Sequence, residues 1–226
     1  MKNNKSYILF LNNKYSTKDN NYFLKKLNGK TTIAVDGGIR FFRKNKIIPD
    51  ILIGDFDSAP RLSKKYLNNI EVLKYPTEKD KTDSQLAVEL ALERGAQKIE
   101  ICGALSKSEI DHTLGNIFLL ELVNRFKKKS NKKQNNILAF LSDSSKRVFL
   151  INNNSIQING KPGSYISIIP VQNSSKVKFS GLVYPPPADD KKLFMGDSLT
   201  LRNQFKNKRA KIEVSGKIII VAYQED

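Results

Sequence analysis

Short apolar runs alternate with helix-like segments from Ser6 to about Ser142, and this alternation constrains the fold more than any other feature. The segment "TDSQLAVELALERG" has apolar residues at helical spacing, can be capped by Thr82 or Asp83, and ends at Gly95. Strands separated by such helices are typical of βαβ units, which build mostly parallel sheets. We therefore expect an α/β domain with strands at Tyr7–Leu11, Thr31–Val35, Ile51–Ile53, Glu71–Leu73, Lys98–Cys102 and Ile137–Leu141.

From Arg147 onward the pattern changes to short runs of alternating apolar residues with no helical segment between them. The runs are "RVFLI", "SIQI", "YISIIP", "KVKF", "SLTL", "AKIEV" and "KIIIVAY", and Asn, Gly, Pro or Ser separates them. Strands at this density are typical of an antiparallel sandwich or barrel, and "VSGKI" at Val214–Ile218 predicts a tight hairpin turn. We expect an α/β domain over residues 1–145 and a smaller antiparallel β-sandwich over residues 146–226.

The bulk composition restricts the compartment and the class of partner. The single cysteine, Cys102, lies in the apolar segment "KIEICGAL", which is typical of a buried thiol in a reducing compartment. No apolar run approaches the roughly 20 residues of a membrane span, so we expect a soluble, cytoplasmic protein without a membrane partner. The formal charge of +17 favours polyanionic partners, but the lysines are mixed with asparagine, as in "NRFKKKSNKKQNN", without interleaved aromatic residues. A solvated basic surface is favoured, and a nucleic-acid-binding module stays open as an alternative.

Acidic residues gather directly after several of the expected strands. In an open parallel sheet, ligands bind at the carboxyl ends of the strands, so these acids are the first candidates for chemistry. Carboxylates at one edge repel each other by on the order of 4 kcal/mol per pair at 4 Å in a dielectric near 20, and Mg²⁺ with nucleotide phosphates would offset that repulsion. The groups are Asp36 with Gly37 and Gly38, Asp55 and Asp57 with Ser58, Asp80 and Asp83 near the start of the expected helix, and Asp111 with His112.

Each group also has a simpler interpretation. Asp-Gly-Gly is common in turns, where glycine permits unusual backbone angles, although here it would also let backbone N–H groups approach phosphates. Asp57 or Ser58 can cap a helix, Asp80 and Asp83 can complement a helix dipole, and His112 can be a capping or core histidine. Four such groups at the ends of consecutive βα units favour a shared site over independent caps.

Several longer motifs occur along the chain in a fixed order. They are "VDGGIRFF", "IPDILIGDFDS", "YPTEKDKTDSQLAVELA" and "IEICGA…DHTLGNIFLL", followed by "GSYISIIPV", "VKFSGLVYP" and "IEVSGKIIIV". This series resembles the thiamine pyrophosphokinase family over nearly the whole chain. The resemblance implies an N-terminal catalytic domain that binds Mg-ATP, a C-terminal β-sandwich, and a homodimer whose interface binds thiamine. The implied reaction moves the pyrophosphoryl group of ATP to the thiamine hydroxyl, giving thiamine diphosphate and AMP.

The resemblance also implies roles for individual residues. Asp55, Asp57, Asp80 and Asp83 match the family's cluster for metal and phosphate, and Asp111 resembles the acid near the substrate. These five are the candidate catalytic residues, and the first four are the candidate Mg²⁺ ligands. The candidates for binding nucleotide or substrate are Asp36, Gly37, Gly38, Ser58, Thr82, Lys107 and Asn203.

Three positions depart from the family pattern. The family usually carries Gly-Gly-Arg before the Asp-His step, whereas this chain reads "GALSKSEIDH", and Lys107 can replace the arginine only as a point charge. Asn203 in "TLRNQF" matches the family, but Arg202 occupies a position where relatives tend to have serine. Arg40 stands where a small polar residue is common and could add a phosphate contact.

Other assignments stay open at this point. D-x-D at Asp55 and Asp57 is also a metal-binding motif of nucleotide-sugar glycosyltransferases, and a degenerate relative could bind thiamine or nucleotide without turnover. Either Asp111 or a cluster acid could take the proton of the acceptor hydroxyl. Lys79 and Lys81, which flank the acids, are expected to be solvated.

Overall fold

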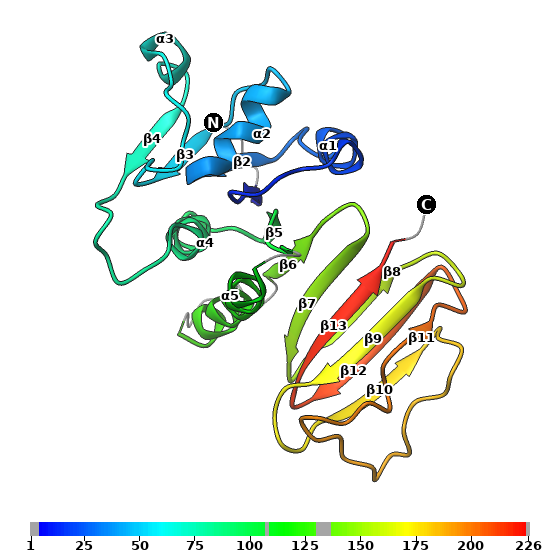
Figure 1. Cartoon of the computed structure of the whole chain (residues 1–226). Coiled ribbons are helices and arrows are strands. Elements are labelled where there is room, and N and C mark those ends of the chain that lie inside the picture. Colours follow the sequence, from blue (N-terminus) through cyan, green and yellow to red (C-terminus); the bar gives the residue numbers. More distant parts are fainter. Residues whose placement is uncertain (1–4, 107–108, 130–136, 225–226) are drawn as a thin grey trace. The chain divides into compact units, whose positions relative to one another are not determined.

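The structure is a computed structural model that describes residues 5–106, 109–129 and 137–224 (Figure 1). The chain forms two compact units, and the boundary between them lies between Ser144 and Ser145. In the part of the chain that the structure describes, no helix has the length and apolar character needed to cross a membrane.

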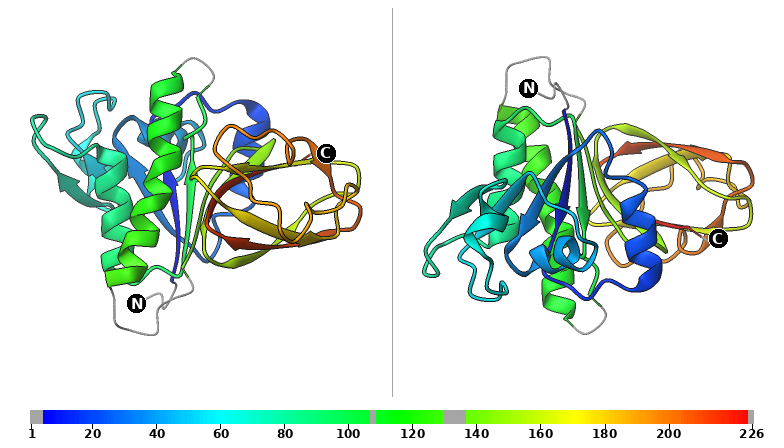
Figure 2. Two further views of the ribbon diagram at one scale, coloured as in Figure 1. Left: turned by 90° about the horizontal axis from the view of Figure 1, so that it is seen from below. Right: turned by 90° about the horizontal axis from the view of Figure 1, so that it is seen from above.

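The first unit is an open parallel sheet with the strand order β6-β5-β1-β2-β3-β4. Helices α4 and α5 pack against each other on one face of the sheet, and α1 and α2 lie on the other face (Figures 1 and 2). The predicted parallel α/β fold is confirmed, and each predicted strand lies within one residue of the observed one. The elements are β1 (Ser6–Phe10), α1 (Thr17–Leu24), β2 (Thr31–Val35), η1 (Asp36–Gly38), α2 (Ile39–Lys44), β3 (Ile51–Gly54), α3 (Lys64–Leu67), β4 (Glu71–Lys74), α4 (Asp83–Glu93), β5 (Lys98–Cys102), α5 (Ile110–Lys129) and β6 (Leu138–Ser142).

An aromatic cluster fixes α1 and α2 on their face of the sheet. Phe10 of β1 stacks on Phe41 of α2 with 4.1 Å between ring centroids, and meets Phe23 of α1 edge to face at 5.5 Å. All three rings are buried, as is Phe42. Burial of aromatic rings of this size dominates the energy of a small core. This packing holds the carboxyl ends of β1 and β2 against the start of α2.

A buried ionic network lies beside the aromatic cluster. Glu100 of β5 is only 1% exposed, and its carboxylate lies 3.0 Å from the ammonium groups of both Lys26 and Lys30. Ser142 of β6 donates a further hydrogen bond of 2.9 Å to the same carboxylate. A buried charge is tolerated when it is paired and hydrogen-bonded in this way. Glu100 thus ties the segment after α1 to the centre of the sheet.

The second unit is a β-sandwich of two antiparallel sheets, ordered β11-β9-β13-β7 and β10-β12-β8. The predicted antiparallel sandwich is confirmed. The strands are β7 (Lys146–Asn152), β8 (Ser155–Asn159), β9 (Tyr165–Pro170), β10 (Lys176–Ser180), β11 (Asn203–Gln204), β12 (Arg209–Ser215) and β13 (Lys217–Tyr223).

The hairpin predicted at "VSGKI" is wrong. The turn is tight, with Gly216 at φ 109°, but β12 pairs with β8 and β10 whereas β13 pairs with β7 and β9. The chain therefore passes from one sheet to the other at this turn. Asn153 stabilises the turn, because its side-chain oxygen accepts a 2.7 Å hydrogen bond from the Gly216 N–H. A local turn signal cannot tell whether the strands that it joins pair with each other or lie in different sheets.

We predict that Glu100→Gln lowers the free energy of unfolding by about 2 kcal/mol, because it leaves Lys26 and Lys30 without their buried counter-charge. The loss is limited because both lysine side chains are partly exposed to water. Urea unfolding measures this difference. Glu213→Gln is the matched control, since its ion pair with Lys211 is exposed, and it should leave the transition unchanged. Equal effects of the two substitutions would contradict a structural role for the network.

The same network predicts a pH dependence. Burial raises the pKa of Glu100, but the charges of Lys26 and Lys30 outweigh burial, so the pKa lies below its usual value in the folded protein. The stabilisation is therefore present above the unfolded-state pKa and is lost as the pH falls through the folded-state value. The gap in stability between the wild type and Glu100→Gln should narrow below about pH 4. A constant gap from pH 7 to pH 3 would contradict this assignment.

Candidate active site

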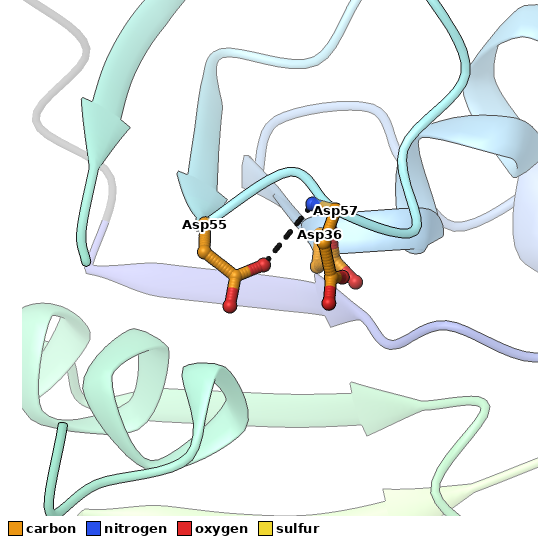
Figure 3. Close-up of side chains that lie close together, drawn as sticks. All are labelled: Asp36, Asp55 and Asp57. Carbon is orange, nitrogen blue, oxygen red and sulfur yellow. Dashed lines mark hydrogen bonds between the residues drawn. The ribbon is translucent and has the colours of Figure 1, made fainter. Parts of the chain in front are cut away.

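Three carboxylates meet at the carboxyl ends of β2 and β3. Asp36 follows β2, and Asp55 and Asp57 follow β3; one oxygen of each lies within 4.8 Å of the others (Figure 3). These two strands are neighbours in the sheet, so their ends deliver the acids to one place. Within the described residues, these are the acids that gather closely enough to share one metal ion.

The backbone around the three acids adopts conformations that few residues favour. Asp36 has φ 46° and Phe56 has φ 70°, both in the left-handed region. Phe56 packs against the aromatic core, so the aspartates on either side of it remain near the surface. Gly54 leaves room for the approach, because a Cβ there would lie 3.1 Å from the Cβ of Asp36. The Asp57 N–H then donates a 3.1 Å hydrogen bond to the Asp55 carboxylate.

Ser58 orients Asp36. Its hydroxyl donates to one oxygen of Asp36 and accepts a 3.1 Å hydrogen bond from the side-chain amide of Asn12. The other oxygen of Asp36, Oδ1, is buried and accepts no hydrogen bond. Burying a carboxylate oxygen without a partner is costly, so this atom is poised for a cation or a donor from a ligand.

Lys79 supplies a positive charge within the site. Its ammonium group lies 3.3 Å from the Asp55 carboxylate and 3.2 Å from that of Asp83, and the side chain is 14% exposed. The solvated state expected for Lys79 is therefore wrong, since two carboxylates hold it. Lys81 is paired too, with Glu89 at 2.7 Å, but it remains about half exposed.

Asp55 and Asp83, the two acids beside Lys79, have pKa values that are shifted in opposite directions. The hydrogen bond from the Asp57 N–H, together with Lys79, lowers the pKa of Asp55. Burial raises the pKa of Asp83, and the charges of Asp55 and Asp36 add to that effect against the opposing influence of Lys79. Asp55 and Asp36 are therefore near enough to raise the pKa of Asp83, which is consistent with its ion pair to the shared Lys79.

The donor set fits a hard divalent cation. All the candidate ligands are carboxylate oxygens, which Mg²⁺ and related ions prefer. Asp36 Oδ1 is buried without a hydrogen bond, and a bound cation would satisfy it. Asp83 Oδ1, also buried, lies 3.2 Å from the Lys79 ammonium group and has that ion pair as its partner. Three closely placed negative charges with one lysine leave an excess of negative charge that such an ion would neutralise.

A cavity of about 620 Å³ opens beside the acid group in the first unit. Asp36 and Asp83 line it, and so do Asp111 and His112 from the first turn of α5. Two hydrogen bonds fix the start of α5: the Thr113 hydroxyl donates to the carbonyl of Ser106, and the Asn116 amide donates to that of Ala104. The cavity is large enough for a small-molecule substrate.

The remaining residues predicted for this region are placed as follows. Asp80 is exposed and lies outside the group of three acids. Thr82 is the N-cap of α4, where its hydroxyl accepts a 3.2 Å hydrogen bond from the Gln85 N–H. Gly38 lies against the backbone carbonyl of Phe10, with which any Cβ would collide, so close packing alone requires this glycine. Lys107 lies outside the described residues.

Asn203 lies in the second unit and is buried. Its side-chain oxygen accepts a 3.0 Å hydrogen bond from the Tyr184 N–H, and its amide donates to the carbonyl of the same residue. Asn203 therefore holds the segment around Tyr184 against β11. The neighbouring Arg202 has its guanidinium 4.1 Å from the centroid of the Tyr165 ring. This cation–π contact with Tyr165 stabilises the positive charge of Arg202 at its position beside Asn203.

Comparison with known proteins connects both units to one family. Residues 24–133 match the model "Thiamin pyrophosphokinase, catalytic domain", and residues 153–219 match "Thiamin pyrophosphokinase, vitamin B1 binding domain". The chain belongs to the thiamine pyrophosphokinase family. The members of this family are thiamine pyrophosphokinases, which are enzymes, so the sequence resemblance is confirmed.

Individual members of the family can be aligned with this chain over most of their length. The thiamine pyrophosphokinase of Bacillus subtilis (strain 168) is 28% identical over 206 residues, which cover 86% of this chain and 87% of the relative. A crystal structure of the Bacillus subtilis protein has a TM-score of 0.77 at 23% identity, covering 98% of this chain and all of the other. The Candida albicans thiamin pyrophosphokinase has a TM-score of 0.75 at 17% identity, covering 99% of this chain and 90% of the other. These structures share the fold.

We predict that Lys79→Met makes the protein more dependent on a divalent cation. Without the ammonium group, Asp55 and Asp83 lose their counter-charge, so added Mg²⁺ should raise the melting temperature of the variant more than that of the wild type. Thermal unfolding with and without Mg²⁺ measures this. Lys81→Met is the control, because Lys81 pairs with Glu89 outside the acid group. Identical Mg²⁺ shifts in all three proteins would contradict the internal counter-charge.

Proposed function

We propose that this chain transfers the pyrophosphoryl group of Mg-ATP to the hydroxyl of thiamine, giving thiamine diphosphate and AMP. The observation that carries this proposal is the group Asp36, Asp55 and Asp57, with a buried and unpartnered Asp36 oxygen, next to a 620 Å³ cavity. The family supports ATP as co-substrate and thiamine as acceptor. Mg²⁺ is our choice of cation because the donors are all carboxylate oxygens.

In this proposal the protein mainly positions the reactants and balances charge. Asp36, Asp55 and Asp57 would hold the cation, which supplies the charge neutralisation that phosphoryl transfer requires. Ser58 keeps Asp36 oriented toward the site. Asp83 reaches the group through Lys79, whereas the contribution predicted for the exposed Asp80 stays a prediction.

The proton of the attacking hydroxyl needs an acceptor within the cavity. Asp111 lines the cavity from the first turn of α5, and Asp36 and Asp83 line the same cavity. We propose Asp111 as the group that accepts this proton, because it lies apart from the three acids that would hold the cation. A carboxylate within hydrogen-bond reach of a hydroxyl can act as a general base.

The direct test is an assay for AMP and thiamine diphosphate with purified protein, thiamine and Mg-ATP. We expect both products in equal amounts, and no product with EDTA. Asp55→Asn should lower turnover by at least about a hundredfold with the fold retained, because it removes charge from the acid group. Asp190→Asn, in the second unit and outside that group, is the control. Near-wild-type turnover by Asp55→Asn would overturn the proposed role of this acid.

We also propose a homodimer in which the second unit contributes to the interface. The segment between β10 and β11 exposes an unusual number of large apolar side chains, and exposed apolar patches mark interaction surfaces. Tyr184 is 62% exposed and Met195 is 70% exposed. The other members of this apolar patch are Val183, Phe194, Leu199 and Leu201.

If this apolar patch forms the dimer interface, a charged side chain placed in it should weaken the dimer. Met195→Lys places an ammonium group in the proposed interface and should shift sedimentation from dimer toward monomer at micromolar concentration. Ile48→Lys, at an exposed apolar position of the first unit, should leave the dimer intact. A wild-type monomer that is active at high dilution would contradict a dimer-dependent site. The cytoplasmic location expected from the sequence stays a prediction.

A further inference from the structure

The cavity has an unusual charge balance for a site that takes a nucleotide. Among its described lining residues are the acids Asp36, Asp83, Glu109 and Asp111, and no lysine or arginine. Lys79 is close by, but it is already held between Asp55 and Asp83. A triphosphate therefore needs positive charge from the cation and from a residue at the rim of the cavity.

Arg40 lies at this rim. It belongs to the first turn of α2, and its Nη1 donates a 2.8 Å hydrogen bond to the side-chain oxygen of Asn12, which lines the cavity. Its Nη2 donates to the backbone carbonyl of Ser58. Ser58 in turn donates its hydroxyl to Asp36. The guanidinium group is thus connected to the group of three acids through a short chain of hydrogen bonds.

The chain makes space for this guanidinium group. A Cβ on Gly37 would lie 2.3 Å from Asn12 Oδ1 and 2.6 Å from Arg40 Nη1, so any larger residue there would force these two side chains to move. The two hydrogen bonds use two of the five N–H donors of the arginine, so further donors of the same exposed side chain are left for an oxyanion. A guanidinium group held by its neighbours loses less conformational entropy when it binds an oxyanion.

We infer that Arg40 binds a phosphate oxygen of the nucleotide at the rim of the cavity. Planar guanidinium donors match the oxygens of a phosphate group in a geometry that lysine cannot reproduce. This inference rests on the proposed function, which identifies the nucleotide as ATP. The competing role is a purely structural clip that fastens the loop after β3 to the end of β1.

The test compares the binding of ATP and of adenosine by calorimetry, with Mg²⁺ and without thiamine. A phosphate contact affects ATP alone, whereas a clip that shapes the cavity affects both ligands. We expect Arg40→Gln to weaken ATP binding at least tenfold and to leave adenosine binding unchanged. Arg40→Lys should lie between the wild type and Arg40→Gln, because it keeps the charge without the fork of donors.

Arg43→Gln is the matched control, because Arg43 is an exposed arginine in the last turn of the same helix. It should bind ATP as the wild type does. Wild-type ATP affinity in Arg40→Gln would overturn the inference, and so would an equal loss of ATP and adenosine binding. Wild-type protein that binds ATP but forms no thiamine diphosphate would refute the proposed function alone, since the Arg40 comparison would still hold.

Discussion

Repulsion among carboxylates is the constraint on which the rest of this site depends. The parallel sheet delivers Asp36, Asp55 and Asp57 to one edge, with one oxygen of each within 4.8 Å of the others. Three such charges would drive the loops apart if nothing opposed them. Lys79 opposes them from the side of Asp83, and the Asp57 N–H does so within its own loop. The buried Asp36 oxygen remains without a partner, which is where a cation has most to contribute.

The packing of the first unit supports this arrangement at a distance. Asp36 and Phe56 occupy left-handed backbone conformations, each costing on the order of 1–3 kcal/mol, and such strain persists only where the surroundings impose it. Phe56 is held by the aromatic core, and Gly54 allows the two strand ends to approach. The same core that anchors α2 also places Arg40 beside the acids. Fold stability and site geometry therefore depend on the same contacts.

Pattern alone predicted the strands, the division into two kinds of fold and the edge where the acids lie. The strands could be predicted because apolar periodicity is a local property of the sequence. The edge could be predicted because the carboxyl ends of parallel strands lie at the same edge of the sheet. The pattern placed Asp36 in the shared site but not among the candidate Mg²⁺ ligands, and it did not separate Asp80 from the close group. That distinction depends on which strand ends are neighbours and on where the loop after β4 runs. The pattern also missed that Lys79 is partly buried between two carboxylates, and that the strands on either side of Gly216 lie in different sheets. Burial and strand pairing both depend on residues distant in sequence.

We propose that Asp36, Asp55 and Asp57 form the cation site. Titration with Mn²⁺, followed by electron paramagnetic resonance, counts the bound ions and measures their affinity. We expect the wild type to bind Mn²⁺ in competition with Mg²⁺. Asp36→Asn should weaken this binding at least tenfold, and Asp80→Asn should have little effect. Unchanged binding in Asp36→Asn, or a larger loss in Asp80→Asn, would contradict this proposal.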